Sequence, residues 1–167
     1  MPYVFVSEAT RQMYKDEIIK EVEKIDTSVE KYLILAIIKQ ESDFHQFAIR
    51  YEPHLKEASW YLKCLKKNDI TNNLSYCSAG PMQILLGIAR SQGFSGSFEE
   101  LMNITNNIYQ GTKLLETLSI QYKEIKDVIA GYNGGPTAIN SKKNDIYLNQ
   151  EYVTNVYLNY KSLGGKQ

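Results

Sequence analysis

Apolar residues recur at helical spacing along most of this 167-residue chain, and this periodicity constrains the fold more than any other feature. No segment shows the sustained apolar–polar alternation that a long β-strand requires, and only Leu74–Ser78 has the composition of a short strand. We therefore expect a mainly α fold: a single domain over residues 1–167 with about seven helices and at most a short β-hairpin.

Start signals and apolar spacing together place the expected helices. Capping boxes are predicted at Thr27 with Glu30 and at Ser97 with Glu100, and the Gly80-Pro81 step is typical of a helix start. The segment Gly134-Gly135-Pro136 is typical of a helix end. The expected helices are Glu8–Lys24, Thr27 to Glu41, His54–Lys66, Gly80 to Ala89, a short one from Ser97, Asn107–Tyr122, Ile125–Tyr132 and Tyr147–Tyr160.

Composition excludes several classes of function. Lys plus Arg and Asp plus Glu both number 19, so the formal net charge is zero, which argues against nonspecific nucleic-acid binding. The longest apolar run, Tyr32–Ile38, is too short to cross a bilayer. The two histidines and two cysteines lack metal-ligand spacing, and no phosphate- or dinucleotide-binding glycine loop occurs, so we expect no metal and no cofactor. Cys64 and Cys77 are expected to be free thiols, with a single local bridge as the alternative.

One carboxylate stands out by its position on a helix. Ile34, Ile37, Ile38 and Glu41 fall at i, i+3, i+4 and i+7, which places Glu41 on the apolar face. Loss of hydration there disfavours the charged carboxylate, raises its pKa and suits it to general acid catalysis. The alternative is a solvent-facing Glu in a frayed last helical turn.

Several motifs follow in order along the chain. They are Glu41-Ser42, Ser78-Ala79-Gly80-Pro81-Met82-Gln83-Ile84, Asn107-Ile108-Tyr109-Gln110-Gly111, Ala130-Gly131-Tyr132-Asn133-Gly134-Gly135-Pro136 and the final Glu151-Tyr152-Val153-Thr154-Asn155-Val156-Tyr157. From Tyr32 to Tyr160 the chain thereby resembles the soluble lytic transglycosylase (SLT) family of peptidoglycan-cleaving enzymes, which are relatives of goose-type lysozyme. The resemblance implies a lysozyme-like fold around a glycan-binding groove. Each motif alone is weak, whereas their order is specific.

The resemblance also implies an activity. A lytic transglycosylase cleaves the β-1,4 bond between N-acetylmuramic acid and N-acetylglucosamine and leaves a 1,6-anhydromuramic end. It uses a single Glu first as general acid and then as base, and Glu41 matches that residue. The implied partner is the peptidoglycan glycan strand. We expect a monomer, or one component of a larger wall-penetrating assembly, acting in the periplasm or cell wall.

The same motifs supply the expected substrate-binding residues. Ser42 would contact substrate or steady the catalytic loop, and Gln83 would bind an acetamido group. Met82 would give the groove an apolar surface, with plain core filling as its alternative. Tyr132 would hydrogen-bond Glu41 or orient the acetamido group. Asn133 would bind substrate or hold its turn, and Tyr152 is a plausible groove residue. Asn107 and Gly111 are expected to be structural.

Three departures from the family pattern carry further expectations. Pro81 replaces the usual Leu before Met-Gln, and residues 1–29 form an expected helical extension that packs on the domain. Residues 44–77 form an expected insertion, and its Arg50–His54 segment resembles a motif of phage-type relatives. Glu52 in that segment is the second carboxylate that a hydrolytic muramidase requires, unless Arg50 and His54 hold it in a structural ion pair. A silent glycan-binding module is the third alternative.

The first eight residues, Met1–Glu8, have no basic region and too short an apolar stretch for a signal peptide. The expectation from this segment is delivery by phage or secretion machinery, or a trimmed form of the protein.

Overall fold

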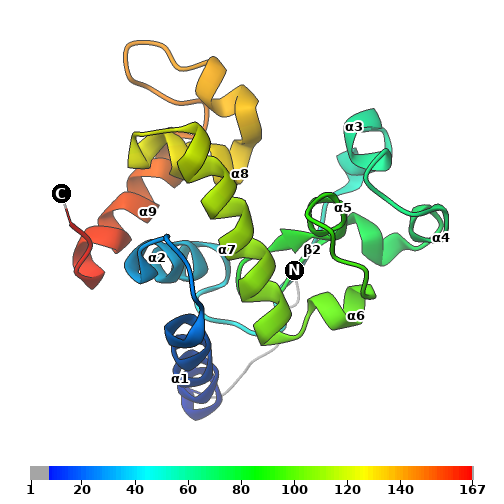
Figure 1. Ribbon diagram of the computed structural model, residues 1–167, viewed down its shortest axis with the longest axis horizontal. Helices are drawn as coiled ribbons and strands as arrows, with labels where there is room; N and C mark the ends of the chain where they lie inside the picture. The colour runs from blue at the N-terminus through cyan, green and yellow to red at the C-terminus, as the bar shows by residue number, and fades with distance from the viewer. Residues whose placement is uncertain (1–7, 167) are drawn as a thin grey trace.

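The computed structural model describes residues 8–166, and Figure 1 shows a helical arrangement with a small sheet at its centre. The mainly α expectation is confirmed, with nine α-helices in the described residues. The larger helices are α1 Glu8–Lys24, α2 Lys31–Ser42, α5 Leu86–Ser91, α7 Ile104–Gln121, α8 Ile125–Asn140 and α9 Gln150–Leu163. The remaining helices have one turn each: α3 Ser59–Leu62, α4 Lys67–Ile70 and α6 Phe98–Leu101, of which α6 was expected. Two 3-10 helices, η1 Pro53–Lys56 and η2 Asn73–Tyr76, are also present.

Helix α2 is the central helix of the core. Its residues 33–38 are all buried, and α9 and α1 both pack against it. A helix that is apolar around its whole circumference has no stable solvent-facing side, so other helices must surround it. The helix ends at Asp43, whose φ of 48° is left-handed, and this termination leaves Glu41 in the last turn.

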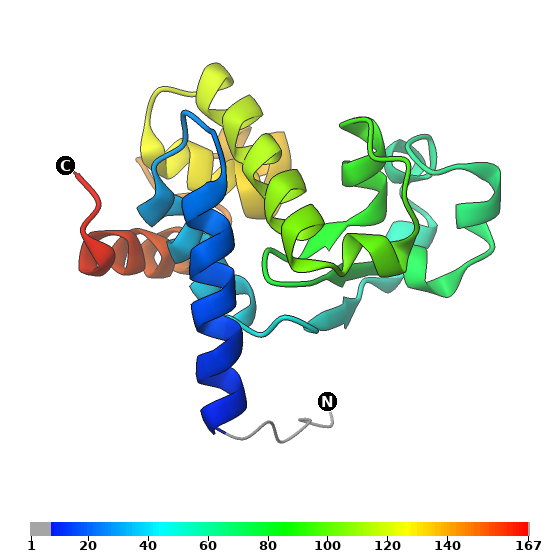
Figure 2. The same ribbon diagram turned by 60° about the horizontal axis from the view of Figure 1, so that its bottom comes forward.

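The N-terminal helix α1 lies across α2 and α7. Ile18 and Val22 are its buried residues, and Thr105 on α7 donates a 2.9 Å hydrogen bond to Glu21. Figure 2 shows that the first half of α1 extends past the rest of the molecule. The expected N-terminal extension is described here from Glu8 onward. Residues 1–7, on which the signal-peptide expectation rests, lie outside the described residues.

Two of the predicted helix starts are wrong. Thr27 and Glu30 form no capping box, because the Thr27 hydroxyl donates to Glu116 (2.6 Å) and the Glu30 carboxylate accepts from Tyr160 (2.8 Å). The helix therefore starts at Lys31. At the other site Gly80 has a φ of +72°, a left-handed conformation that makes a turn instead of a helix. The Ser97–Glu100 capping box is confirmed, with hydrogen bonds of 2.6 and 3.2 Å.

The predicted helix His54–Lys66 is also wrong. Pro53–Lys56 forms a 3-10 turn, and Ala58, with a ψ of 97°, breaks the helical path before Ser59–Leu62 begins. Buried Tyr61 anchors this irregular segment, because its hydroxyl donates to the Ser75 carbonyl and accepts from the Gly87 N–H. Tertiary anchoring thus overrides the helical spacing of the apolar residues.

A three-stranded antiparallel sheet forms the second part of the molecule. Strands β1 Ile49–Tyr51, β2 Cys77–Ala79 and β3 Ile84–Leu85 lie in the order β1-β2-β3. Arg50 pairs with Ser78 and Ser78 with Leu85. The expected strand at Leu74–Ser78 is confirmed only from Cys77, since Asn73–Tyr76 is a 3-10 helix.

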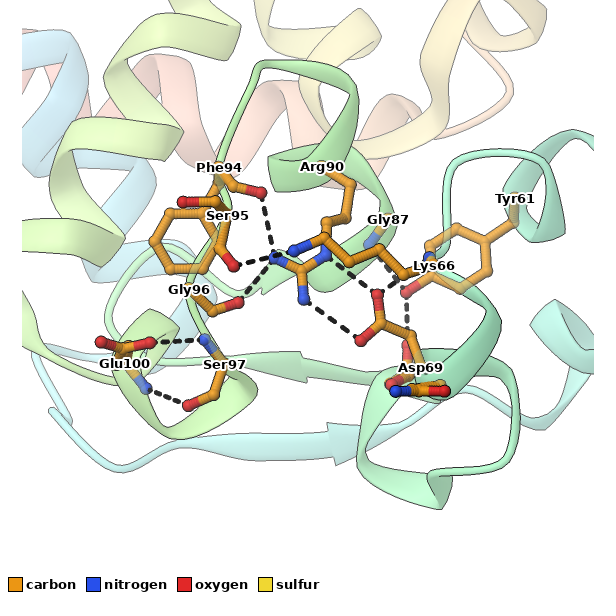
Figure 3. Close-up of polar contacts among 12 residues, drawn as sticks. Tyr61, Lys66, Asp69, Gly87, Arg90, Phe94, Ser95, Gly96, Ser97 and Glu100 are labelled. Carbon is orange, nitrogen blue, oxygen red and sulfur yellow. Dashed lines mark hydrogen bonds and ion pairs between the residues drawn. The ribbon is translucent and has the colours of Figure 1, made fainter.

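An ion pair fastens the segment between β1 and β2 to α5 (Figure 3). The Arg90 guanidinium binds both carboxylate oxygens of Asp69 at 2.9 and 3.1 Å, and it also donates to the carbonyls of Phe94 and Gly96. The Arg90 side chain is only 7% exposed. Its contacts fix α4 and the loop after α5 relative to each other.

Helix α8 contains a kink. Gly135 has φ 61° and ψ −165°, so the first helical stretch of α8 ends at the predicted stop, Gly134-Gly135-Pro136, slightly beyond Tyr132. A second helical stretch, which was not predicted, follows to Asn140. Cys64 and Cys77 are free, as expected. Within residues 8–166 no helix combines the length and apolarity needed to span a bilayer.

Candidate active site

A groove is lined by residues of the sheet and α5, by residues of α7 and α8, and by the end of α2. Figure 1 shows how these helices are arranged. Five expected site residues line it: Glu41, Glu52, Gln83, Tyr132 and Asn133. The remaining lining residues are Arg50, His54, Ser78, Ile84, Leu85, Ile88 and Leu114.

Glu41 lies partly buried in this groove. Burial raises the pKa of its carboxyl above the ordinary value. The hydrogen bond that Tyr152 donates to Glu41 Oε1, at 2.7 Å, partly opposes that rise in pKa. Arg50 lowers the same pKa through its positive charge, and Glu52 raises it through its negative charge. The arrangement is that of a carboxyl kept available as a proton donor.

Two tyrosines from different helices frame this carboxyl. Tyr152 on α9 contacts it directly, whereas Tyr132 on α8 donates its hydroxyl to the Met82 carbonyl at 2.8 Å. The hydrogen bond to Glu41 that was one prediction for Tyr132 is therefore made by Tyr152. Burial, and then the charge of Glu41, raise the pKa of both phenols well above the ordinary value. Both tyrosines remain hydrogen-bond donors at neutral pH.

The turn between β2 and β3 is tied to the end of α2. The Ser42 hydroxyl donates to the Pro81 carbonyl at 2.8 Å, which matches the predicted steadying role. Fully buried Asn107 accepts from the Met82 N–H at 2.8 Å and donates to the Ala79 carbonyl at 2.7 Å. Its structural role is as expected, and these bonds fix the β2–β3 turn.

Gln83 and Met82 differ in what they offer a ligand. Gln83 lines the groove, but its amide already donates to the carbonyls of Ala48 (3.0 Å) and Gly80 (2.9 Å) and accepts from Ser78 (2.9 Å). Met82 is fully buried, and its sulfur packs so closely on Gly111 that a Cβ there would lie 2.3 Å away. Met82 therefore lies beneath the groove, which matches its alternative reading as core.

Asn133 is exposed at the groove edge, on α8 just before the kink. Its side-chain oxygen accepts a 3.0 Å hydrogen bond from Asn149, which also donates to the Ala130 carbonyl. This hydrogen bond orients the Asn133 side-chain amide at the groove edge. Asn149 could not be selected from the sequence, because its partners lie on α8 and are brought to it by tertiary packing.

The β1 wall of the groove is charged. Arg50 Nε lies 2.5 Å from Glu52 Oε1, and His54 Nδ1 lies 3.8 Å from Glu52 Oε2. This is the ion pair that the sequence offered as the alternative to a catalytic role for Glu52. The groove is also lined by Leu85, Ile88 and Leu114, which give it an apolar surface. Sequence reasoning did not select these three, since helical spacing does not separate groove-facing from core-facing aliphatic residues.

Within the described residues, no three His, Cys, Asp or Glu side chains are grouped as metal ligands. The comparison with protein families gives one finding. The model described as transglycosylase SLT domain matches residues 18–154, which is most of the chain and includes every groove residue named above. No curated protein matches the chain.

Proposed function

The chain belongs to the transglycosylase SLT domain family, and from this membership we propose that it is a peptidoglycan lytic transglycosylase with Glu41 as its catalytic residue. The family consists of enzymes that act on peptidoglycan. The observation that carries the proposal is Glu41 itself: a carboxyl on the groove, with a pKa raised by burial and an oxygen held by Tyr152. A glycan-binding module without activity would not require such a proton donor.

In the first step the Glu41 carboxyl gives its proton to the glycosidic oxygen between N-acetylmuramic acid and N-acetylglucosamine. The bond from that oxygen to C1 breaks, and the bonding electrons stay on the oxygen of the departing sugar. The carbonyl oxygen of the muramoyl 2-acetamido group bonds to C1 and stabilises the developing positive charge.

In the second step the Glu41 carboxylate removes the proton of the muramoyl C6 hydroxyl. The C6 oxygen bonds to C1, the acetamido oxygen leaves, and a 1,6-anhydromuramic end results. Glu41 is again protonated and no water is consumed. The bond from Tyr152 occupies Oε1, which supports Oε2 as the oxygen that transfers the proton in both steps.

Neighbouring groups support these steps without exchanging protons. Ser42 and Tyr132 both hold the β2–β3 turn, through the carbonyls of Pro81 and Met82. The free amide hydrogens of Asn133 and the apolar surface of Leu114 suit the acetamido group and the ring face of a sugar. Neutral hydrogen bonds and apolar contact suffice for a saccharide, which agrees with a chain of zero net charge.

Hydrolysis is the second candidate, and the presence of Glu52 in the same groove as Glu41 favours it. As a base, Glu52 would activate a water molecule on the opposite face of the sugar. Its 2.5 Å pairing with Arg50 argues for the lytic reaction instead, because a carboxylate engaged by a guanidinium is a weaker base.

Product analysis of digested peptidoglycan tests the proposal. We expect muropeptides one water lighter than reducing-end products, and no cleavage by Glu41→Gln. Reducing ends alone, with activity lost in Glu52→Gln, would replace the lytic reaction by hydrolysis. Wild-type cleavage by Glu41→Gln would remove Glu41 from either mechanism. The proposed site of action is the periplasm or cell wall, where this substrate lies.

A further inference from the structure

Within residues 8–166, the outer edge of β1 has no hydrogen-bond partner along its length. The Ala48 carbonyl accepts one backbone hydrogen bond of 2.8 Å, and the Glu52 N–H donates another of 2.8 Å. The partner of each lies in the chain that flanks β2. In an antiparallel pair the alternate residues, here Ile49 and Tyr51, direct their backbone N–H and C=O groups away from the partner strand. Among residues 8–166 no group hydrogen-bonds to these outward-facing positions.

This open edge forms the rim of the groove. The sheet order makes β1 an outermost strand, and Figure 2 shows it, in cyan, on the outside of the sheet. The side chains of Arg50 on β1 and of Glu52, the residue directly after β1, line the groove. A group that leaves the groove over this wall therefore meets the free backbone of Ile49 and Tyr51.

The surroundings of the edge suit an extended, anionic chain. Ile49 and Tyr51 alternate with the groove-lining residues, so they lie on the other face of the sheet, 46% and 48% exposed. The Lys56 ammonium stands 5.6 Å from the centre of the Tyr51 ring, and the Arg50 side chain is half exposed. An exposed edge strand of this kind is a template for strand addition.

We propose that the open edge of β1 binds the stem peptide of the muramoyl residue in the groove, as an added strand. The inference rests on the proposed function, because that function places a peptide-bearing sugar beside this wall. The peptide hangs from the lactyl group of N-acetylmuramic acid, carries carboxylates that Lys56 and Arg50 attract, and offers its own N–H and C=O groups. Two facing residues, Ile49 and Tyr51, are enough for a short peptide.

A titration of the Glu41→Gln protein with two matched ligands tests the inference. One ligand is the N-acetylglucosamine–N-acetylmuramic acid disaccharide carrying a tetrapeptide, and the other is the same disaccharide without the peptide. We expect the peptide to tighten binding about tenfold, the scale of a few hydrogen bonds. In ¹⁵N-labelled protein the amide signals of Ile49 and Tyr51 should shift and exchange more slowly only with the peptide-bearing ligand.

Two variants separate the backbone from the side chain. Tyr51→Pro removes an outward N–H and should abolish the peptide's contribution, because a proline on a free edge spares the bonds to β2. Tyr51→Ala keeps the N–H and should retain most of the affinity that the peptide adds. Amide spectra verify that each variant is folded, and Ile49→Pro replaces Tyr51→Pro if that variant unfolds.

Three results would overturn the inference. They are equal affinity for the two ligands, equal loss in Tyr51→Ala and Tyr51→Pro, and amides of Ile49 and Tyr51 already protected before ligand is added. The last result would mean that residues 1–7 or a second copy of the chain, and not the peptide, occupies the edge. Cleavage of peptide-free strands by the unsubstituted protein tests the proposed function separately.

Discussion

Tyr152 on α9 donates a 2.7 Å hydrogen bond to Glu41 Oε1 at the end of α2, across 111 positions of sequence. This contact joins the two helices that pack along each other in the core, so the packing of these helices orients the Glu41 carboxyl. A phenol donating to a carboxylate stabilises the charged form, and the bond accordingly lowers the pKa that burial raises.

Tyr152→Phe should therefore shift the activity profile and reduce the rate. Without the donor, the Glu41 pKa rises further, so the loss of activity on the alkaline side should move to higher pH. Loss of orientation should cost about tenfold in kcat/KM, corresponding to one hydrogen bond to a charged group. Rates across a pH series measure both effects. Tyr157→Phe, on the same helix but outside the groove, serves as the control, and an unchanged profile in Tyr152→Phe would contradict the assigned role.

Glu41→Gln should stabilise the folded protein at neutral pH while removing activity. The folded-state pKa of Glu41 is raised above the unfolded value, so the folded form binds its proton more tightly. Stability is therefore lost as pH rises from the unfolded pKa through the folded pKa, and the neutral amide of Gln avoids this loss at pH 7. At pH values below the unfolded pKa the difference should vanish.

Urea unfolding at both pH values checks this expectation. Exposed Glu151→Gln is the matched control and should change stability little. A Glu41→Gln protein less stable than wild type at pH 7 would show that the carboxylate stabilises the fold.

Arg50→Gln and Glu52→Gln should move the alkaline limb of activity in opposite directions. Arg50 lowers the Glu41 pKa and Glu52 raises it, so removal of Arg50 should shift the limb to higher pH and removal of Glu52 to lower pH. Both shifts should shrink in high salt, because the interactions are between partly exposed charges. Shifts in the same direction would mean that the two residues act through their mutual ion pair.

Gly80→Ala should be far more damaging than Gly93→Ala. Both glycines have left-handed φ values, +72° and +91°, so both substitutions carry backbone strain of about 1 kcal/mol. Only at Gly80 would the new Cβ lie 2.5 Å from the Asn107 side chain, which holds the β2–β3 turn. We expect at least about 2 kcal/mol of further destabilisation and loss of activity for Gly80→Ala. Thermal unfolding and cleavage rates provide the comparison. Equal destabilisation in the two variants would mean that the positive φ alone accounts for it.

Arg90→Leu should destabilise the protein by about 3 kcal/mol, because it leaves Asp69 and two loop carbonyls without their partner. The Arg90 hydrogen bonds hold the pKa of Asp69 below its usual value. This contribution is present above the unfolded pKa of Asp and is lost as pH falls through the lower folded pKa. Acid titration of stability in wild type and Arg90→Leu measures it. Exposed Arg11→Gln should leave the acid limb unchanged.

Local spacing in the sequence predicted the parts of the site that depend on one helix. The i, i+3, i+4, i+7 pattern placed Glu41 on the buried face of α2, and the structure has it there. The Tyr152 contact could not be predicted, because it depends on how α9 packs against α2. Gly80-Pro81 was wrong for a related reason: the same two residues suit a helix start or a left-handed turn, and buried Asn107, far along the chain, selects the turn.

The register of β1 against β2 decides what kind of surface the groove presents. Side chains alternate along a strand, so a slip by one residue would turn Arg50 and Glu52 outward and bring Ile49 and Tyr51 inward. The backbone bonds at Ala48 and Glu52 hold the present register at both ends of a three-residue strand. One residue gained or lost in the segment from Asp43 to Ala48 would thus replace the charged wall of the groove by a more apolar one, while Glu41 itself stayed in place.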